Sequence, residues 1–288
     1  MKNRLSALFF LPLVLFSLAA CKPSGSGPEA TGAKTEPTGR ELPPLTVTVL
    51  NVGKADCILI RTENHLAVID TGEKADADAV NTAIKRTGTK TIDCLILSHF
   101  DKDHIGAAEK VLKKNKTLRI LEPDYKKESD TADDLKKMMQ KNGYVPEVVT
   151  GETTFTLDDA VFTVYPALKD DYGNEDSNVF SLVVRVVHGD NVFLFCGDAE
   201  GQRLSELNEV LPAGCTFLKV PHHGVYDNFS NDFLSRVSPA YAVVTCSGSE
   251  RPDAKVLKIL EGLGAKTYLT LSGTVTAVSD GVNLAVNQ

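Results

Sequence analysis

The chain has 288 residues, of which 42% are hydrophobic and 24% are charged, and its formal net charge is −7. This length and composition are those of a globular protein with a substantial core and exclude a disordered or fibrous chain. The negative charge argues against unselective binding to nucleic acid or anionic lipid through net charge alone. No tryptophan is present for the base stacking that is typical of dedicated single-strand binders.

The first 20 residues have the layout of a secretory signal, with a basic start, an apolar stretch from Leu5 to Leu18 and small residues before Cys21. About 14 apolar residues are too few to cross a bilayer, which needs ~20. The ending at Cys21 resembles the lipobox of bacterial lipoproteins, in which the cysteine becomes the lipidated first residue. We therefore expect a signal peptide over 1–20 and a lipid on Cys21, with a plain secretory signal or an uncleaved anchor as the alternatives. Residues 21–44 hold almost nothing apolar and predict a disordered tether.

The remaining residues, 45–288, predict one domain in which β-rich stretches carry interspersed helices. Strands are expected at 45–52, 57–61, 65–70, 92–98, 118–121, 162–165, 179–187, 191–195, 216–220, 240–246, 267–271, 273–278 and 283–286. Helices are expected at 74–87, 103–114, 130–142, 201–210, 230–236 and 252–263. Two strand-rich halves, each with helices, predict two mixed sheets packed face to face with helices outside, a four-layer αββα sandwich of the α/β (α+β) class.

Two smaller features of this domain have structural explanations. His188 opens a hairpin turn and is interpreted as a turn residue rather than a ligand. Five cysteines besides Cys21 lie in or beside apolar runs at irregular spacing. Because an odd number at such spacing does not make a disulfide framework, we expect buried thiols.

The densest group of metal-binding side chains is the segment 98–104, Ser-His-Phe-Asp-Lys-Asp-His, which follows the apolar run Ile92–Leu97. His99, Asp101, Asp103 and His104 carry imidazole and carboxylate groups, which are ordinary ligands of divalent cations. Capping of the following helix would need one Asp or Ser, not this density. The segment therefore predicts a centre for one or two metal ions.

Three further segments with polar side chains lie where a predicted strand gives way to a loop. They are Asp70-Thr71-Gly72, Cys196-Gly197-Asp198 and Pro221-His222-His223-Gly224. Each alone is weak evidence, since Asp and Gly are common in turns. Loops at strand ends are where rigid scaffolds place their catalytic groups. Together with 98–104 these segments supply histidines and carboxylates for two ions, with one carboxylate free to bridge.

The order of these motifs resembles that of the metallo-β-lactamase superfamily, and within it the hydrolase domain of ComEC-type competence proteins and its free-standing relatives. The resemblance spans residues 45–288. It depends on the segments 51–56, 98–106, 177–182 with 197–198, and 218–224. Several separated motifs in the right order are far more specific than any one of them.

The resemblance implies a role for each member of the 98–104 segment. His99 and Asp101 would bind a first metal ion, and Asp103 and His104 a second. Asp198 would bridge the two ions.

The resemblance also implies roles for the later motifs. His223 would be the remaining ligand of the second ion. His222 would lie near the site, where it contacts substrate or transfers a proton, so that Asp103 and His222 are the candidate catalytic residues. Asp70 would accept hydrogen bonds that fix the ligand loop and the imidazole tautomers, and Asn178 would also support the ligands.

The chain departs from the family pattern at the first metal and at one substrate position. Asp101 stands where most of the superfamily has histidine, and no histidine lies between His104 and His188. The first ion would thus be held more loosely, or its set of ligands would be completed by Asp176, Asn178 or water. More oxygen ligands favour Mn²⁺ or Mg²⁺, although Zn²⁺ binds such sites strongly, so we expect two divalent ions, Zn²⁺ or Mn²⁺, with Mg²⁺ as an alternative.

Arg251-Pro252 stands where the competence branch commonly has His-Pro. The guanidinium group of Arg251 suits a phosphate or carboxylate, which makes it a candidate substrate contact.

The leading hypothesis is an extracytoplasmic, lipid-anchored hydrolase in which a metal-bound hydroxide attacks a phosphodiester, with single-stranded DNA as the substrate that the resemblance suggests. One alternative is a phosphodiesterase acting on an envelope polymer, similar to choline-phosphate esterases of the same fold, or a lactam or lactone hydrolase. Another is a non-catalytic, ligand-binding lipoprotein with a degenerate metal site. Retention of Asp103, His104, Asp198 and His223 favours an enzyme.

Overall fold

The computed structural model describes residues 39–173 and 177–288. The predicted signal peptide, Cys21 and most of the predicted tether therefore lie outside the described residues, as does Asp176. The chain is already attached to the domain at Leu42, whose N–H donates to the carbonyl of Asp280 at 2.6 Å. Within 39–173 and 177–288, no helix is both long enough and apolar enough to cross a bilayer.

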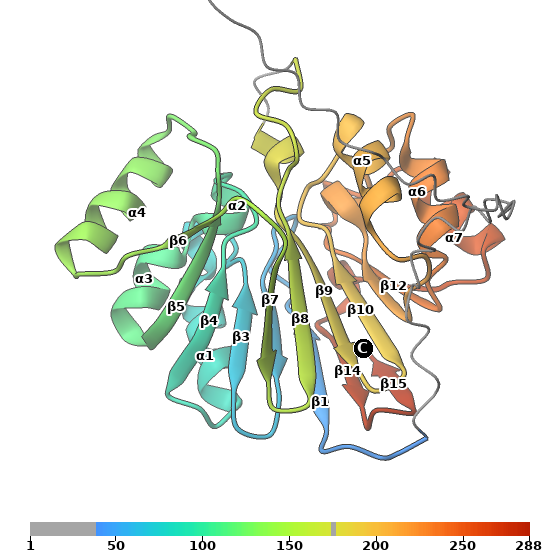
Figure 1. The fold of residues 1–288 in the computed structure, drawn as a ribbon, viewed down its shortest axis with the longest axis horizontal. Coiled ribbons are helices and arrows are strands. Elements are labelled where there is room, and N and C mark those ends of the chain that lie inside the picture. Colours follow the sequence, from blue (N-terminus) through green and yellow to red (C-terminus); the bar gives the residue numbers. More distant parts are fainter. Residues whose placement is uncertain (1–38, 174–176) are drawn as a thin grey trace, which may run out of the picture. The chain divides into compact units, whose positions relative to one another are not determined.

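The domain consists of two mixed β-sheets (Figure 1). The first has the order β15-β14-β1-β2-β3-β4-β5-β6, and its strands from β3 to β6 are parallel. Its strands are β1 (Leu45–Val49), β2 (Ile58–Arg61), β3 (Leu66–Ile69), β4 (Thr91–Ile96), β5 (Lys116–Pro123), β6 (Glu147–Val149), β14 (Val275–Ser279) and β15 (Leu284–Asn287).

The second sheet has the order β13-β12-β11-β10-β9-β8-β7, and its strands from β10 to β13 are parallel. Its strands are β7 (Thr153–Leu157), β8 (Ala160–Tyr165), β9 (Val183–His188), β10 (Asn191–Phe195), β11 (Phe217–Lys219), β12 (Tyr241–Val244) and β13 (Lys266–Leu269).

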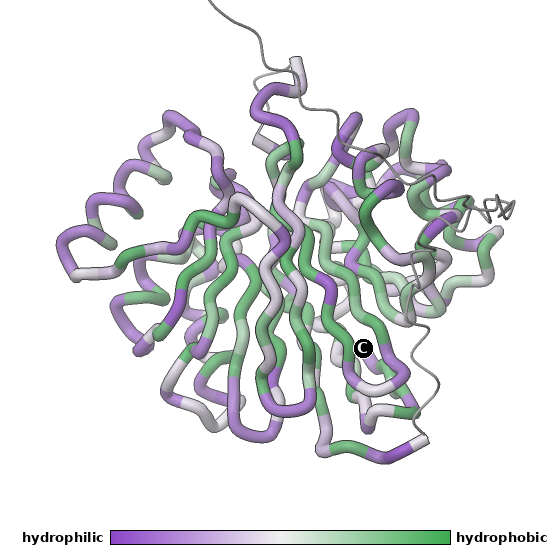
Figure 2. Tube along the Cα trace, viewed as in Figure 1, coloured by the Kyte–Doolittle hydropathy of each residue, from purple (hydrophilic) through white to green (hydrophobic). Residues whose placement is uncertain are grey.

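Helices cover the outer face of each sheet. They are α1 (Ala77–Arg86), α2 (Lys102–Ile105), α3 (Ala108–Lys114), α4 (Asp130–Lys141), α5 (Gln202–Val210), α6 (Ser230–Val237) and α7 (Ala254–Gly262). The apolar faces of α1, α3 and α4 pack on the first sheet, and those of α5, α6 and α7 pack on the second. Side chains from both sheets, such as Val47, Ile60, Phe162 and Phe193, fill the space between them. Figure 2 shows the hydrophobic strands between polar helix surfaces. The predicted four-layer αββα sandwich is confirmed.

The structure differs from the predicted elements in several places. The predicted strand 179–187 begins with a 3₁₀ turn, Ser177–Phe180, and pairs as β9 only from Val183. The predicted helix 103–114 is two helices, α2 and α3, that are separated at Gly106 and Ala107. Strands β6 and β7 were not predicted.

The five cysteines after Cys21 are free thiols, as expected, and only Cys215 among them is not fully buried.

The fold gathers four motif loops at one edge. Two of them follow the parallel pair β3 and β4, and the other two follow the parallel pair β10 and β11. The two pairs belong to different sheets, but they meet where the N–H of Leu182 donates to the carbonyl of Ser98 at 2.8 Å. Gly197 has φ 51°, and a Cβ there would lie 2.9 Å from the Ser98 side chain. A glycine is required at this contact because the β4 and β10 loops approach so closely.

Candidate metal centre

Four side chains from three of these loops converge on one point. Asp103, His104, Asp198 and His223 each offer a ligand atom, and these atoms all lie within 4.8 Å of one another. The carboxylate of Asp198 lies between the two imidazoles, with Oδ1 3.2 Å from His104 Nε2 and Oδ2 3.1 Å from His223 Nε2. The second carboxylate, that of Asp103, approaches His223 Nε2 at 3.6 Å. The two histidines and Asp198 are buried, whereas Asp103 is half-buried.

The donor set of this cluster fits a divalent cation. The Nε2 atoms of His104 and His223 are buried and make no hydrogen bond within the described chain. Their Nδ1 atoms are occupied, because His104 donates to Asp70 Oδ2 at 2.8 Å and His223 donates to Thr245 Oγ1 at 2.8 Å. This network assigns the tautomer in which each Nε2 presents a lone pair to the centre, the usual arrangement of a metal-binding histidine. Two imidazoles and two carboxylates suit Zn²⁺ or Mn²⁺.

The carboxylates of Asp103 and Asp198 carry the negative charge of the centre, and the two imidazoles and Lys219 are the groups that can balance it. Burial raises the pKa of the Asp198 carboxyl, but His104, His223 and Lys219 outweigh it, so that the pKa lies well below its ordinary value. Burial lowers the pKa of His104, yet Asp198 and Asp70 raise it well above its ordinary value. The carboxylates therefore stabilise positive charge beside them. Protonated imidazoles provide this charge in the absence of metal, and a metal cation would provide it when the imidazoles are neutral.

Asp70 supports the ligand loop from the end of β3. Its carboxylate accepts hydrogen bonds from Ser98 N at 2.7 Å, from Ser98 Oγ at 2.6 Å and from the ring of His104. Its backbone has φ 57°, an uncommon conformation for a residue other than glycine. Asp70 thus lies where its sequence motif predicts and orients both the loop and one ligand.

A buried ion pair behind the centre was not predicted as part of the site. Lys219, at the end of β11, is fully buried and places Nζ 2.5 Å from Asp56 Oδ2 and 3.5 Å from Asp198 Oδ1. The other oxygen of Asp56 accepts from Thr245 Oγ1 at 2.7 Å, and Thr245 in turn holds His223. Burial lowers the pKa of Lys219, but Asp56 and Asp198 outweigh it and raise the pKa. The available signal was a lysine inside an apolar strand.

The two adjacent histidines point to different surroundings because of an unusual turn. His222 and His223 have φ 45° and 53°, in the left-handed region that such residues rarely adopt. His223 turns inward to the centre, whereas His222 remains partly exposed and pairs its Nδ1 with Glu200 Oε2 at 2.7 Å. The Nδ2 of Asn178 lies 3.4 Å from His222 Nε2 and 3.4 Å from Glu200 Oε1. Asn178 is therefore placed to support His222.

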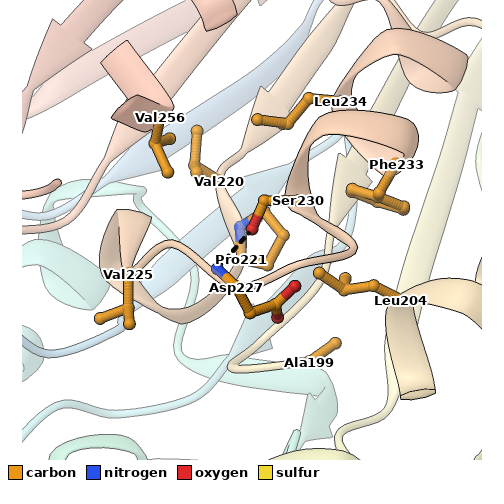
Figure 3. Close-up of a pocket in the computed structure, with 10 residues that line it drawn as sticks. All are labelled: Ala199, Leu204, Val220, Pro221, Val225, Asp227, Ser230, Phe233, Leu234 and Val256. Atoms are coloured by element: carbon orange, nitrogen blue, oxygen red, sulfur yellow. Dashed lines mark hydrogen bonds between the residues drawn. The ribbon is translucent and has the colours of Figure 1, made fainter. Parts of the chain in front are cut away.

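Packing behind this turn holds it in place (Figure 3). Pro221 and Val225 flank the turn and contact a small void of about 10 Å³ that is closed by side chains of α5 and α6. A void of this size holds one water at most and cannot be a substrate site. The loop beyond is tied down because Asp227 accepts from Gly201 N at 2.8 Å and its own N–H donates to Ser230 Oγ at 2.9 Å.

The two predicted ligands of the first ion are near the centre but are not part of the four-residue cluster. His99 is buried, with Nε2 3.8 Å from Asp101 Oδ1. Burial, and then the charge of His104, lower the pKa of His99 to about 3, so its ring is neutral. Asp101 Oδ1 accepts hydrogen bonds from the ammonium of Lys127, at 2.5 Å, and from the hydroxyl of Ser177. Neither of these two partners was predicted.

Arg251 is exposed, and the following Pro252 packs against Gly224 at the end of the histidine turn. A larger cavity, of about 390 Å³, lies among β5, β6 and α4. Its lining includes the aromatic residues Phe100 and Tyr125, and its charged residues are Lys126, Lys127, Lys136, Glu122, Asp124, Glu128 and Asp133. Lys127 links this cavity to the candidate centre, because its ammonium contacts Asp101.

Comparison with known proteins agrees with this geometry. Residues 50–248 match the family model described as the metallo-beta-lactamase superfamily. ComE operon protein 3 of Bacillus subtilis (strain 168) is 30% identical over 179 residues, which are 60% of this chain and 23% of that protein. Competence protein ComA of Neisseria gonorrhoeae is 28% identical over 245 residues, which are 80% of this chain and 31% of that protein. The chain thus spans less than a third of the length of either relative.

Solved structures share the fold. The metallo-beta-lactamase fold protein YhfI of Bacillus subtilis has a TM-score of 0.52 and 12% identity, over 85% of this chain and 100% of that one. A diphosphatase of the PhnP family has a TM-score of 0.50 and 15% identity, over 78% of this chain and 94% of that one. At these identities the likeness concerns the fold alone. From the family match, the chain belongs to the metallo-β-lactamase superfamily and is a metal-dependent hydrolase.

Proposed function

We propose that this hydrolase is a phosphodiesterase that acts outside the cytoplasm, with single-stranded DNA as the leading substrate. The observation that carries the proposal is the convergence of two imidazole Nε2 atoms and two carboxylates at 4.8 Å or less. One relative, ComA, is named as a competence protein, and competence is the uptake of DNA. Attachment to the membrane through a lipid on Cys21 is part of the proposal and is carried by the sequence.

Asp103, His104, Asp198 and His223 would hold the divalent ion, Zn²⁺ or Mn²⁺, with Mg²⁺ as an alternative. When bound, such an ion lowers the pKa of water and neutralises charge on the attacked phosphoryl group. Lys219 and Asp56 keep the carboxylate of Asp198 in place, because Lys219 Nζ also donates to the carbonyl of Gly197 at 3.0 Å. A second ion at His99 and Asp101 stays a prediction from the sequence.

His222 is placed to move a proton at the mouth of the centre. Its ring centroid lies 6.3 Å from that of His223, and its side chain is 19% exposed. Glu200 holds Nδ1 and thereby orients Nε2 towards Asn178. In the proposed reaction His222 delivers a proton to the leaving oxygen, which makes it the catalytic partner of Asp103 and the ion.

The surroundings of the centre support an anionic organic substrate. The cavity lined by Phe100, Tyr125 and Lys127 offers apolar surface for a base or another organic group, and the ammonium of Lys127 would be its contact to phosphate. Arg251 remains the second proposed phosphate contact, since it is exposed in the segment that follows β12. We expect Arg251→Ala to weaken phosphodiester binding without changing the content of metal.

Hydrolysis of bis(p-nitrophenyl) phosphate tests the proposal. Protein purified without chelator, then stripped and reloaded with Mn²⁺, Zn²⁺ or Mg²⁺, should cleave this diester only in the reloaded state. Asp198→Asn is the inactive control. A chromogenic lactam and p-nitrophenyl phosphorylcholine are the comparison substrates for the lactamase and envelope-phosphodiesterase alternatives. Protein that retains its metal but cleaves none of the three would contradict the proposal and favour the ligand-binding lipoprotein.

A further inference from the structure

The carboxylate of Asp101 already forms an ion pair with a cationic side chain of this protein, that of Lys127. Lys127, in the segment between β5 and α4, places its Nζ 2.5 Å from Asp101 Oδ1. The same ammonium donates to Ser177 Oγ at 3.0 Å, and the hydroxyl of Ser177 donates to the same oxygen of Asp101. The contact is partly shielded from water, since the side chains of Lys127 and Asp101 are 31% and 27% exposed.

The Lys127 ammonium occupies the carboxylate that a first metal ion would need as a ligand. The other predicted ligand, His99, is buried, and its Nε2 makes no hydrogen bond within the described residues and lies 3.8 Å from the same oxygen of Asp101. An ion held by both residues would therefore lie within a few ångströms of the lysine nitrogen. Two cations at that separation repel each other strongly, and the carboxylate oxygen that the ion needs is already occupied twice.

The ligands that remain do not fit a second divalent ion. A catalytic metal site ordinarily has three protein ligands. Besides a bridge from Asp198, which the other cluster already uses, only one neutral imidazole and one carboxylate are near, and the Lys127 ammonium occupies that carboxylate. The cluster of Asp103, His104, Asp198 and His223 fits an ion without help from either of them. The sequence expectation of two metal ions thus disagrees with the donor set that the structure shows at Asp101.

We propose that the Lys127 ammonium takes the place of the first metal ion, so that the centre combines one divalent ion with one lysine. In this arrangement Lys127 neutralises a non-bridging phosphate oxygen of the substrate, which extends the proposed phosphodiesterase function and rests on it. Lys127 also lines the 390 Å³ cavity, so that it can contact a substrate bound there and the centre at the same time. Its charge is fixed on the chain, whereas a loosely held second ion would have to be acquired from solution.

Counting bound ions tests the replacement without any need for turnover. Stripped protein is equilibrated with excess Mn²⁺, separated from free metal and analysed for manganese, and its spin-resonance spectrum is recorded for coupling between paired ions. The wild type should hold one uncoupled ion. Lys127→Met should admit a second, weaker ion, because it frees Asp101, whereas Lys127→Arg should retain a single ion. An exposed lysine of α4 outside the cavity lining provides the control, since Lys137→Met should behave as the wild type.

Inorganic phosphate tests the substrate contact at one equivalent of Mn²⁺. Because a hydrogen bond to a charged group is lost, phosphate should bind Lys127→Met about tenfold more weakly than the wild type, with Lys137→Met unchanged. Unchanged phosphate affinity in Lys127→Met would overturn the contact. Two coupled ions in the wild type, or a single ion in Lys127→Met, would overturn the replacement. If the ion counts hold but bis(p-nitrophenyl) phosphate is not cleaved, the proposed function fails and the lysine assignment stands.

Discussion

Replacement of Lys219 by methionine should destabilise the protein far more than replacement of a surface lysine. Lys219 is fully buried, with its ammonium 2.5 Å from Asp56, 3.5 Å from Asp198 and 3.0 Å from the carbonyl of Gly197. Methionine fills much of the same volume, so that little cavity is created. The main effect is that the Asp56 carboxylate, which is 1% exposed, loses its counter-ion.

The expected cost follows from the energetics of buried charges. Removal of one partner of a buried ion pair costs about 3–5 kcal/mol, because the remaining charge is neither solvated nor paired. The pair is ionised on both sides, since burial raises the pKa of Asp56 but Lys219 and the two nearby histidines outweigh it and lower the pKa. Lys219→Met combined with Asp56→Asn should therefore cost less than the two single changes together, by about 1–3 kcal/mol.

Urea unfolding of the metal-free protein measures these differences. The control is Lys258→Met on the exposed face of α7, which should change the free energy of unfolding by no more than about 0.5 kcal/mol. A Lys219→Met variant as stable as the Lys258→Met control would refute the reasoning. So would strictly additive costs in the double variant, because the two residues would then not be coupled.

Three further predictions concern the histidine turn, the anchor and acid stability. His223→Ala should lose both ion and turnover, whereas His222→Ala should keep the ion and lose about 10²- to 10⁴-fold in rate, as metal analysis and kinetics on the same preparations would show. Cys21→Ser should move the protein from the membrane fraction to the soluble fraction, and continued sedimentation with membranes would contradict the lipoprotein assignment. The pKa of Asp158 is lowered to about 2 because a hydroxyl and an amide of the turn after β2 hydrogen-bond to its carboxylate. The resulting stabilisation is present above the unfolded-state pKa of about 4 and is lost as pH falls towards 2, so the stability difference between wild type and Asp158→Asn should be full at pH 6 and shrink on acidification.

Most of the fold could be predicted because its buried strands and amphipathic helices have clear periodicity. The strands that were missed lack that signal. In β7, Thr153–Leu157, half-buried residues alternate with exposed ones at the edge of a sheet, and β6 has only three residues. The last two residues of the 3₁₀ turn Ser177–Phe180 were included in the strand predicted at 179–187 because the apolar run of the sequence begins at Val179.

The sequence predicted those parts of the candidate site whose residues are close together in the chain. It did not predict contacts between residues that are far apart in the chain. His99 to His104 form one local motif. Asp56 reaches Thr245 across 189 positions, and nothing in either local sequence predicts that contact. Likewise the lysines at 126, 127, 136, 137 and 141 are typical of a solvated helix face, and only the fold brings Lys127 to Asp101.

Anomalous diffraction from crystals soaked in Mn²⁺ or Zn²⁺ tests the central claim most directly. The account predicts one strong anomalous peak, about 2.0–2.3 Å from the Nε2 atoms of His104 and His223 and from an oxygen of Asp198. It also predicts no peak between His99 and Asp101, where the Lys127 ammonium would remain. An ion bound elsewhere, or no ion among these ligands, would contradict the assignment of the metal centre.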